Sequence, residues 1–196
     1  MEKKNKKLEN KEKEKKGMLF LKELILIAVF VFIIRGFLFG TIEVKGSSMQ
    51  PNFQHGDFLA VNKLYGWFLE PKKGDVIVCK SSTGNSNENL IKRVIGMPED
   101  EINIVLNEQS REIEYFVYIN GEKIEEDYLL ETMQQSGNME YPFIVPEGSY
   151  FVMGDNRNAS TDSRTKSVGA IEKKNVKGKV FFRIYPFSDF GVIQKK

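Results

Sequence analysis

Residues 145–164 read VPEGSYFVMGDNRNASTDSR and combine an apolar run with a dense polar turn. Tyr150–Met153 is rich in aromatic and β-branched residues and predicts a β-strand. The polar side chains that follow need one another as hydrogen-bond partners if the turn is even partly buried. A calcium loop is the rival interpretation, but the acids are too few and lack the D-x-[DN]-x-[DN]-G spacing with a terminal Glu. We therefore expect a strand ending in a hydrogen-bonded turn, with no metal.

The same strand pattern recurs along the chain from Thr41 onward, where short apolar runs alternate with Gly, Pro, Asn and Asp. Asn120-Gly121 is the strongest short signal for a β-hairpin. Ser81–Asn89 reads SSTGNSNEN and predicts a polar loop. We expect a mainly β fold of antiparallel strands. The predicted strands are Phe58–Val61, Asp75–Cys79, Ile91–Ile95, Ile102–Leu106, Tyr115–Ile119, Tyr150–Met153 and Lys179–Ile184.

One segment stands apart: Met18–Phe39 reads MLFLKELILIAVFVFIIRGFLF. As a helix it would be about 33 Å long, and a bilayer's hydrocarbon core is about 30 Å thick. A cleaved signal peptide would want small residues near its end, whereas Gly36–Phe39 is mostly bulky. A buried helix of a soluble protein is the other alternative, but the segment is apolar all round. We predict a transmembrane anchor helix over residues 18–39.

Charge divides the chain into a basic tail and an acidic remainder. Residues 1–17 hold eight Lys and four Glu, whereas residues 40–196 hold nineteen Lys and Arg against twenty-two Asp and Glu. The basic tail predicts an N-terminus in the cytoplasm, which leaves residues 40–196 as an extracytoplasmic domain. We expect the tail to be disordered. Basic charge confined to the tail argues against a nucleic-acid partner.

Single copies of Cys79 and His55 restrict the chemistry. No intramolecular disulfide can form, and a zinc site of Cys/His type is not expected. A Ser/His/Asp triad would have to depend on His55 alone. No cofactor is expected.

Two further segments carry candidate catalytic residues. Gly46–Pro51 reads GSSMQP, in which Gly beside Ser allows a tight turn that presents a hydroxyl, although an ordinary loop fits equally well. Lys92 lies in the apolar run Leu90–Gly96 and would point into the domain, where burial lowers an amine's pKa. An edge-strand lysine that guards against aggregation is the alternative. Arg93 should point away from Lys92, as a surface or packing residue.

Taken together, these segments resemble the type I signal peptidase family in its Gram-positive form. GSSMQP resembles the family's nucleophile box, Gly74–Val78 its Gly-Asp-x-Val strand, and Lys92–Pro98 its general-base box. The turn that begins at Gly154 matches the last box closely. The resemblance covers nearly the whole chain, in order.

The resemblance implies a role for each matching residue. Ser48 would be the nucleophile, with its backbone N–H in the oxyanion hole, and Lys92 the general base. Ser160 would hydrogen-bond the Lys92 amine. Asp162 and Arg164 would form an ion pair beneath the site. Gly154, Asp155 and Arg157 would hold the turn.

The chain also departs from the family's pattern. Gly46 stands where some relatives carry a Ser that adds an oxyanion-hole donor, so the second donor stays open. Asn52-Phe53 replaces a common Thr-Leu, and Glu99 replaces a common Gly. Lys92 distinguishes the chain from the branch that carries His at this place.

By resemblance, the protein would be a membrane-bound serine endopeptidase that acts on signal-peptide-bearing preproteins. It would form an acyl-enzyme and cut after small residues at positions −3 and −1. The substrate would add as a strand, with residues flanking Ser48, Asp75–Cys79 and Lys92–Ile95 as lining candidates. We expect a monomer in the cell membrane. Tyr65–Leu69 would either dip into the bilayer interface or pack on the core. A self-cleaving Ser/Lys repressor and a membrane-tethered binding module or inactive relative are the alternative functions.

Overall fold

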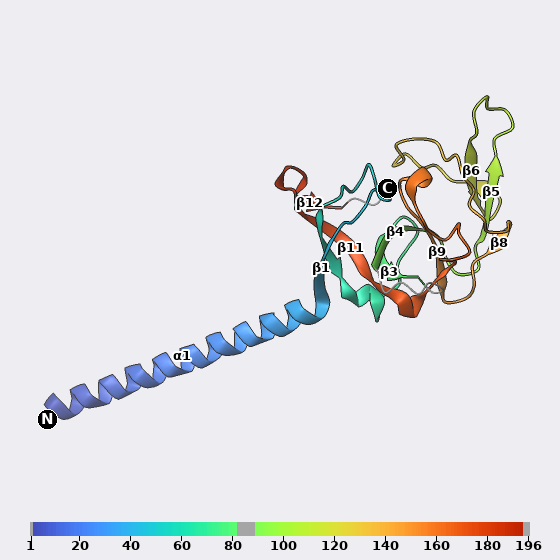
Figure 1. Ribbon diagram of the computed structural model, residues 1–196. Helices are drawn as coiled ribbons and strands as arrows, with labels where there is room; N and C mark the ends of the chain where they lie inside the picture. The colour runs from blue at the N-terminus through green and yellow to red at the C-terminus, as the bar shows by residue number, and fades with distance from the viewer. Residues whose placement is uncertain (1, 82–88, 194–196) are drawn as a thin grey trace. The chain divides into compact units, whose positions relative to one another are not determined.

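The computed structural model describes residues 2–81 and 89–193. The chain divides into two units, residues 1–39 and residues 40–196. In the first unit a single helix, α1, runs over Glu2–Leu38 (Figure 1). Its Lys15–Leu38 part is long and apolar enough to cross a membrane, and none of its apolar window is buried.

The prediction that the tail of residues 1–17 is disordered is wrong, because α1 begins at Glu2. Lys and Glu are good helix formers. A tail joined to a stable helix extends that helix without the cost of a new nucleus.

The second unit holds two sheets, and all the strands predicted from the sequence lie in them. The larger sheet has the order β1-β2-β11-β3-β4-β9-β10, and β12 pairs with β11. Its strands are β1 (Phe39–Glu43), β2 (Phe58–Asn62), β3 (Val76–Lys80), β4 (Asn89–Gly96), β9 (Ser149–Met153), β10 (Ile171–Glu172), β11 (Val176–Tyr185) and β12 (Gly191–Val192). From β2 through β11, β3, β4 and β9 to β10, neighbouring strands are antiparallel.

The smaller sheet has the order β7-β6-β5-β8 and is also antiparallel. Its strands are β5 (Glu101–Leu106), β6 (Tyr115–Ile119), β7 (Glu122–Lys123) and β8 (Phe143–Ile144). Asn120 and Gly121 both have positive φ, 52° and 84°, as a type I′ hairpin turn requires. They join β6 to β7, so the hairpin prediction is confirmed.

Four short 3₁₀ helices complete the described elements: η1 (Lys63–Gly66), η2 (Arg157–Ala159), η3 (Lys173–Asn175) and η4 (Phe187–Asp189). Residues 82–88 of the predicted polar loop lie outside the described residues, and Asn89 already belongs to β4.

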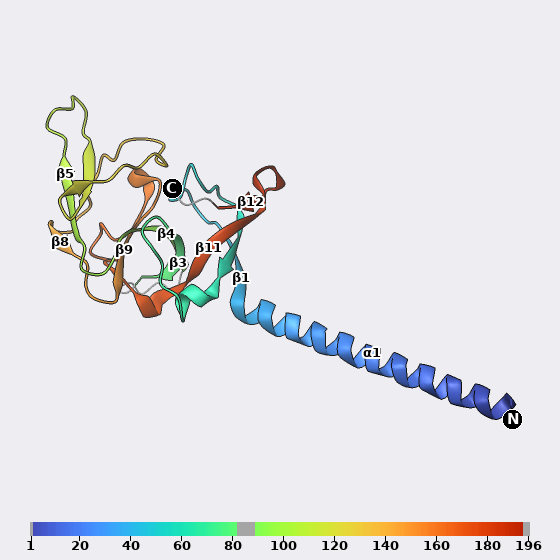
Figure 2. The ribbon, with the colours of Figure 1, turned by 180° about the vertical axis from the view of Figure 1, so that it is seen from behind.

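Strand alternation buries both faces of the larger sheet. Along β3, Val76 and Val78 join a cluster with Met49 and Phe53, whereas Ile77 and Cys79 join a cluster on the opposite face. Phe151 and Met153 of β9 belong to a third cluster, which the smaller sheet covers. Figures 1 and 2 show β4 between β3 and β9, with β5, β6 and β8 grouped beyond β9. This arrangement fixes the positions of β4, which carries Lys92, and of β9, which is followed by the polar turn.

Candidate active site

Ser48 lies on a tight turn that buried apolar side chains hold in place. Met49 and Phe53 are each 1% exposed and anchor the turn in the core, while Ser48 itself is half-buried. The Phe53 N–H donates to the Met49 carbonyl at 2.9 Å, and the Gly46 N–H donates to His55 Nδ1 at 3.3 Å. Gly46 has φ of +86°, the left-handed region that glycine adopts readily. The turn therefore presents the Ser48 hydroxyl from a fixed backbone.

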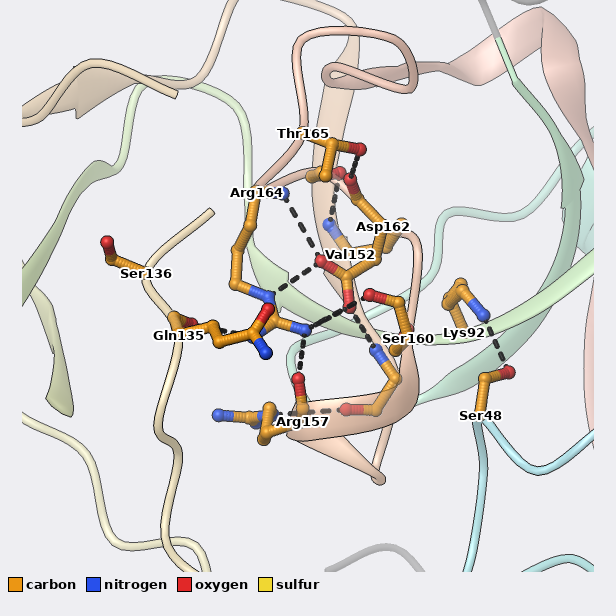
Figure 3. A network of polar contacts seen from close by, with 12 residues as sticks. Ser48, Lys92, Gln135, Ser136, Val152, Arg157, Ser160, Asp162, Arg164 and Thr165 are labelled. Carbon is orange, nitrogen blue, oxygen red and sulfur yellow. Dashed lines mark hydrogen bonds and ion pairs between the residues drawn. The ribbon is translucent and has the colours of Figure 1, made fainter. Parts of the chain in front are cut away.

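Lys92 approaches Ser48 from the middle of β4. Its Nζ lies 2.8 Å from Ser48 Oγ, within hydrogen-bond distance (Figure 3). The side chain is 3% exposed. A lysine that guards a strand edge against aggregation must be exposed to solvent, so this alternative is wrong. The structure brings together the hydroxyl and the amine that the sequence singled out.

The surroundings of Lys92 make its neutral form easier to reach than in a free lysine. Burial lowers the pKa of its amine below the ordinary 10.5, and the negative charge of Asp162 opposes this shift only in part. A neutral amine has a lone pair that can accept a proton from a hydroxyl. The pair thus has the geometry and the electrostatics for activating a serine.

The polar turn after β9 is built around Asp162 and Arg164, as the resemblance implied. Arg164 Nε and Nη2 lie 2.8 and 2.9 Å from the two Asp162 oxygens, and both side chains are buried. The Gly154 N–H donates to Asp162 Oδ2 at 2.9 Å. Burial alone would raise the pKa of Asp162, but the hydrogen bonds and charge of Arg164 outweigh it, and the pKa is lowered. Asp162 is therefore an ionised buried acceptor for the turn.

Gly154 lies where the polar turn meets the nucleophile turn. A Cβ on this residue would come 2.4 Å from the Ser48 carbonyl oxygen and 2.3 Å from Ser160 Oγ. The N–H of the nearby Asn156 donates to the same Ser48 carbonyl at 3.0 Å. Only glycine leaves room for this contact.

Ser160 does not make the contact that the resemblance implied. Its Oγ is buried and has no hydrogen-bond partner among the described residues, so the hydrogen bond to the Lys92 amine is not formed. The hydroxyl instead packs against Gly154. Figure 3 shows Ser160 on the same turn as Asp162, with Lys92 bonded to Ser48 alone among the residues drawn.

Asp155 and Arg157 lie in the turn as expected, but their partners were not foreseen. Asp155 accepts from Arg93 Nε at 2.8 Å and Nη2 at 2.6 Å. Arg157 donates to Glu126 through both terminal nitrogens, one of them at 2.8 Å. The surface role considered for Arg93 is wrong, because the side chain is 3% exposed, although it does leave the strand on the face opposite Lys92. Its place in an apolar strand was a signal for burial, whereas nothing in the local sequence marked Glu126.

A groove of about 710 Å³ opens beside Ser48. Its walls are Thr41–Gly46 on one side and Asn89–Lys92 on the other, with Ser48 and Met49 also lining it. Two segments predicted to line the pocket, Asp75–Cys79 and Lys92–Ile95, contribute only Lys92 to this groove, so the prediction is wrong for their other residues. Arg93 is the first residue of β4 that pairs with β9, so within the described residues Asn89–Lys92 pairs with β3 alone. This part of β4 has an open edge along the groove.

No group of three or more His, Cys, Asp and Glu side chains gathers as a metal site in the part of the chain that the structure describes.

Comparison with known proteins identifies one family over most of the chain. A family model described as "Signal peptidase, peptidase S26" matches residues 18–185. Signal peptidase I of Bacillus licheniformis is 36% identical over 190 residues, which cover 92% of this chain and 96% of the relative. Signal peptidase I S of Bacillus subtilis is 32% identical over 191 residues, covering 93% and 97% respectively. A crystal structure of a signal peptidase I from Enterococcus faecalis matches with a TM-score of 0.44 and 29% identity, over 57% of this chain and 97% of the other.

The family match spans the apolar part of α1, every strand except β12, and every residue of the candidate site. The relatives match over nearly their full length and support a signal peptidase I function, that of a peptidase hydrolase. The chain belongs to the signal peptidase family, peptidase S26.

Proposed function

We propose that this protein is a membrane-bound serine endopeptidase that removes N-terminal signal peptides from secreted preproteins, with Ser48 as nucleophile and Lys92 as general base. The observation that carries the proposal is the 2.8 Å contact between Lys92 Nζ and Ser48 Oγ, made by an amine that is 3% exposed. A hydroxyl needs an adjacent base to become an effective nucleophile. A serine and a neutral lysine supply both parts without a histidine.

The reaction follows from this pair. Neutral Lys92 accepts the Ser48 proton while Oγ bonds to the scissile carbonyl carbon, and the carbonyl π electrons move to oxygen. When this tetrahedral intermediate collapses, the C–N bond breaks and the Lys92 ammonium returns its proton to the leaving amine. An ester of Ser48 remains. Lys92 then deprotonates a water as its oxygen attacks the ester carbon. When this second tetrahedral intermediate collapses, the C–Oγ bond breaks and the Lys92 ammonium returns the proton to Ser48 Oγ. The signal peptide leaves as a carboxylic acid, which loses its proton to solvent.

The oxyanion of each intermediate needs donors already in place. The Ser48 N–H donates to no protein acceptor within the described part of the chain, so it is free to bind the oxyanion. Losing one such donor typically costs about 3–4 kcal/mol of transition-state stabilisation.

The groove suits an extended peptide. Within the described residues, the backbone of Asn89–Lys92 pairs on the β3 side alone, so its other edge could pair with a substrate strand. Alternate side chains of a bound strand face the same way, so residues at −1 and −3 would point together into the wall beside Ser48. The proposed enzyme prefers substrates with small residues at these two positions.

The anchor places this chemistry at the membrane, where signal peptides are presented. Residues 18–39 would span the bilayer, the basic residues 1–17 would stay in the cytoplasm, and residues 40–196 would act outside as a monomer. Tethering enzyme and preprotein to one bilayer raises their effective concentration.

The test is cleavage of a purified preprotein by the full chain in detergent, beside Ser48→Ala and Lys92→Ala variants of matched thermal stability. The wild type should cut after a small-x-small sequence, and both variants should be inactive. A wild type that binds the preprotein without cutting it would favour the tethered binding module. Full activity of Lys92→Ala would remove the general base from the mechanism.

A further inference from the structure

The loop of residues 124–142 joins β7 to β8 of the smaller sheet, and hydrogen bonds connect it to the polar turn after β9. Asn158 accepts from the Gln134 N–H at 2.8 Å and donates to the Thr132 carbonyl at 3.0 Å. Arg164 Nη1 donates to the Gln135 carbonyl at 3.0 Å. Three hydrogen bonds thus attach the loop to the turn that Asp162 and Arg164 support.

Tyr128 on this loop contacts all three segments that build the site. Its carbonyl accepts from Asn52 Nδ2 at 2.8 Å, which reaches the nucleophile turn. Its ring lies 4.3 Å from the guanidinium carbon of Arg93, the residue that follows Lys92 in β4. Its hydroxyl accepts from Arg157 Nη2 at 3.2 Å, which reaches the polar turn. Tyr128 is 6% exposed, so these contacts are sheltered from water.

Asp155 closes the same network on the other side of Arg93. Its carboxylate holds Arg93 through two hydrogen bonds and also accepts from Asn52 Nδ2 at 2.9 Å. Asn52 therefore donates to both Tyr128 and Asp155. The stability of the buried Arg93–Asp155 pair depends on good hydrogen-bond geometry and on exclusion of water, because a poorly compensated buried charge is costly. The Tyr128 ring covers one face of the guanidinium and attracts it through its π electrons.

We propose that Tyr128 is a positioning residue for signal-peptide cleavage, which holds the Ser48 turn against the Lys92 strand through Asn52 and the Arg93–Asp155 pair. The proposal rests on the proposed function, since positioning has meaning only if Ser48 and Lys92 react. Tyr128 does not line the groove beside Ser48, so its loss should lower kcat and leave KM nearly unchanged.

The experiment compares three variants of the full chain in detergent, assayed well below the lowest unfolding midpoint. Tyr128→Leu removes the ring, and Tyr128→Phe restores the ring without the hydroxyl. Tyr115→Leu is the matched control, because Tyr115 is a partly buried ring that packs on the core of the smaller sheet. We expect Tyr128→Leu to lose about 10- to 100-fold in kcat, as for a misplacement of about 1 Å. Tyr128→Phe should recover most of this loss, and Tyr115→Leu should lower the unfolding midpoint without lowering kcat comparably.

Hydrogen exchange gives a readout that does not need turnover. The Asn156 N–H, bonded to the Ser48 carbonyl, and the Phe53 N–H, bonded to the Met49 carbonyl, should exchange faster in Tyr128→Leu than in Tyr115→Leu. An unchanged kcat in Tyr128→Leu, equal damage from Leu and Phe, or equal exchange in the two Leu variants would each overturn the proposal. An inactive wild type would defeat the proposed function instead, and the exchange rates would still decide whether Tyr128 holds the two turns.

Discussion

Gly154 lies against the backbone of Ser48 so closely that a Cβ would come 2.4 Å from the Ser48 carbonyl oxygen. Real Cβ atoms do not approach backbone oxygen at this distance, so any side chain at residue 154 must displace the nucleophile turn or the polar turn. We therefore predict that Gly154→Ala lowers kcat by about 100-fold, as a shift of about 1 Å does. Overpacking should also cost about 1–3 kcal/mol of unfolding free energy.

Peptide-cleavage kinetics and urea unfolding would measure these two effects. Gly191→Ala is the matched control, because a Cβ there meets no atom within 4 Å and the residue does not need a positive φ. Wild-type kcat in Gly154→Ala would show that the two turns tolerate separation.

Lys92 predicts how activity depends on pH. Burial lowers the pKa of its amine below 10.5, and only the neutral amine can accept the Ser48 proton. The value of kcat/KM should therefore rise with pH through a midpoint below 10.5 and be lost as pH falls through that midpoint. A pH series of kcat/KM with a neutral peptide substrate measures it. A midpoint at or above 10.5 would contradict a buried neutral base.

The same lowered pKa predicts how stability depends on pH. Because the folded state binds a proton at Lys92 less well than the unfolded state, the lysine destabilises the fold below its folded pKa. The penalty is relieved as pH rises from the folded pKa towards the unfolded value of 10.5. Lys92→Met, which keeps the volume and removes the charge, should be more stable than the wild type at neutral pH, by an amount that shrinks towards pH 10.5. Denaturant unfolding at several pH values tests this.

The buried Asp162–Arg164 pair should be sensitive to the loss of one partner. Asp162→Asn leaves Arg164 buried without its counter-charge, and such a loss typically costs about 3–5 kcal/mol. The pKa of Asp162 is lowered, so its contribution to stability is complete above the unfolded pKa and is lost as pH falls through the folded pKa. Glu140→Gln, which breaks an exposed pair with Lys166, should change stability little. Equal effects of the two substitutions in urea unfolding would contradict the prediction.

Trp67 reports on whether its loop meets the bilayer. It is the single tryptophan of the chain and is 49% exposed, next to Phe68 at 76%. Exposed aromatic rings favour the membrane interface over a role in the core. We expect brominated lipids to quench Trp67 fluorescence when the full chain is reconstituted in vesicles. A Trp67→Phe, Glu147→Trp variant is the control, and equal quenching of both tryptophans would argue against a specific contact.

The proposed topology can be tested with an impermeant maleimide on intact cells. Burial raises the pKa of Cys79 to about 12, so the native thiol should stay unlabelled. A cysteine introduced by Glu147→Cys should react from outside, and one introduced by Lys6→Cys only after the membrane is opened. The reverse pattern would place the catalytic domain in the cytoplasm.

Local patterns in the sequence were enough to predict the anchor, the strands and the Asn120-Gly121 hairpin. Each of these depends on a few consecutive residues: an apolar run long enough to span a bilayer, an aromatic and β-branched stretch, or a pair that accepts positive φ. The resemblance to a family also singled out Ser48, Lys92 and the turn around Asp162, and the structure places Lys92 Nζ 2.8 Å from Ser48 Oγ. The helical tail was missed because its fate depends on the helix to which it is joined.

Only the tertiary structure decided how the site is supported. Arg93 meets Asp155, Arg157 meets Glu126 and Asn52 meets Tyr128, and the partners are 31 to 76 residues apart in the chain. Nothing near any of these residues in the sequence marks its partner, because each contact exists only after distant segments of the chain have packed together. The position of the Ser160 hydroxyl likewise depends on the close approach of Gly154 to Ser48. The sequence by itself determined which groups can react, and packing between distant segments determined where those groups lie and what holds them there.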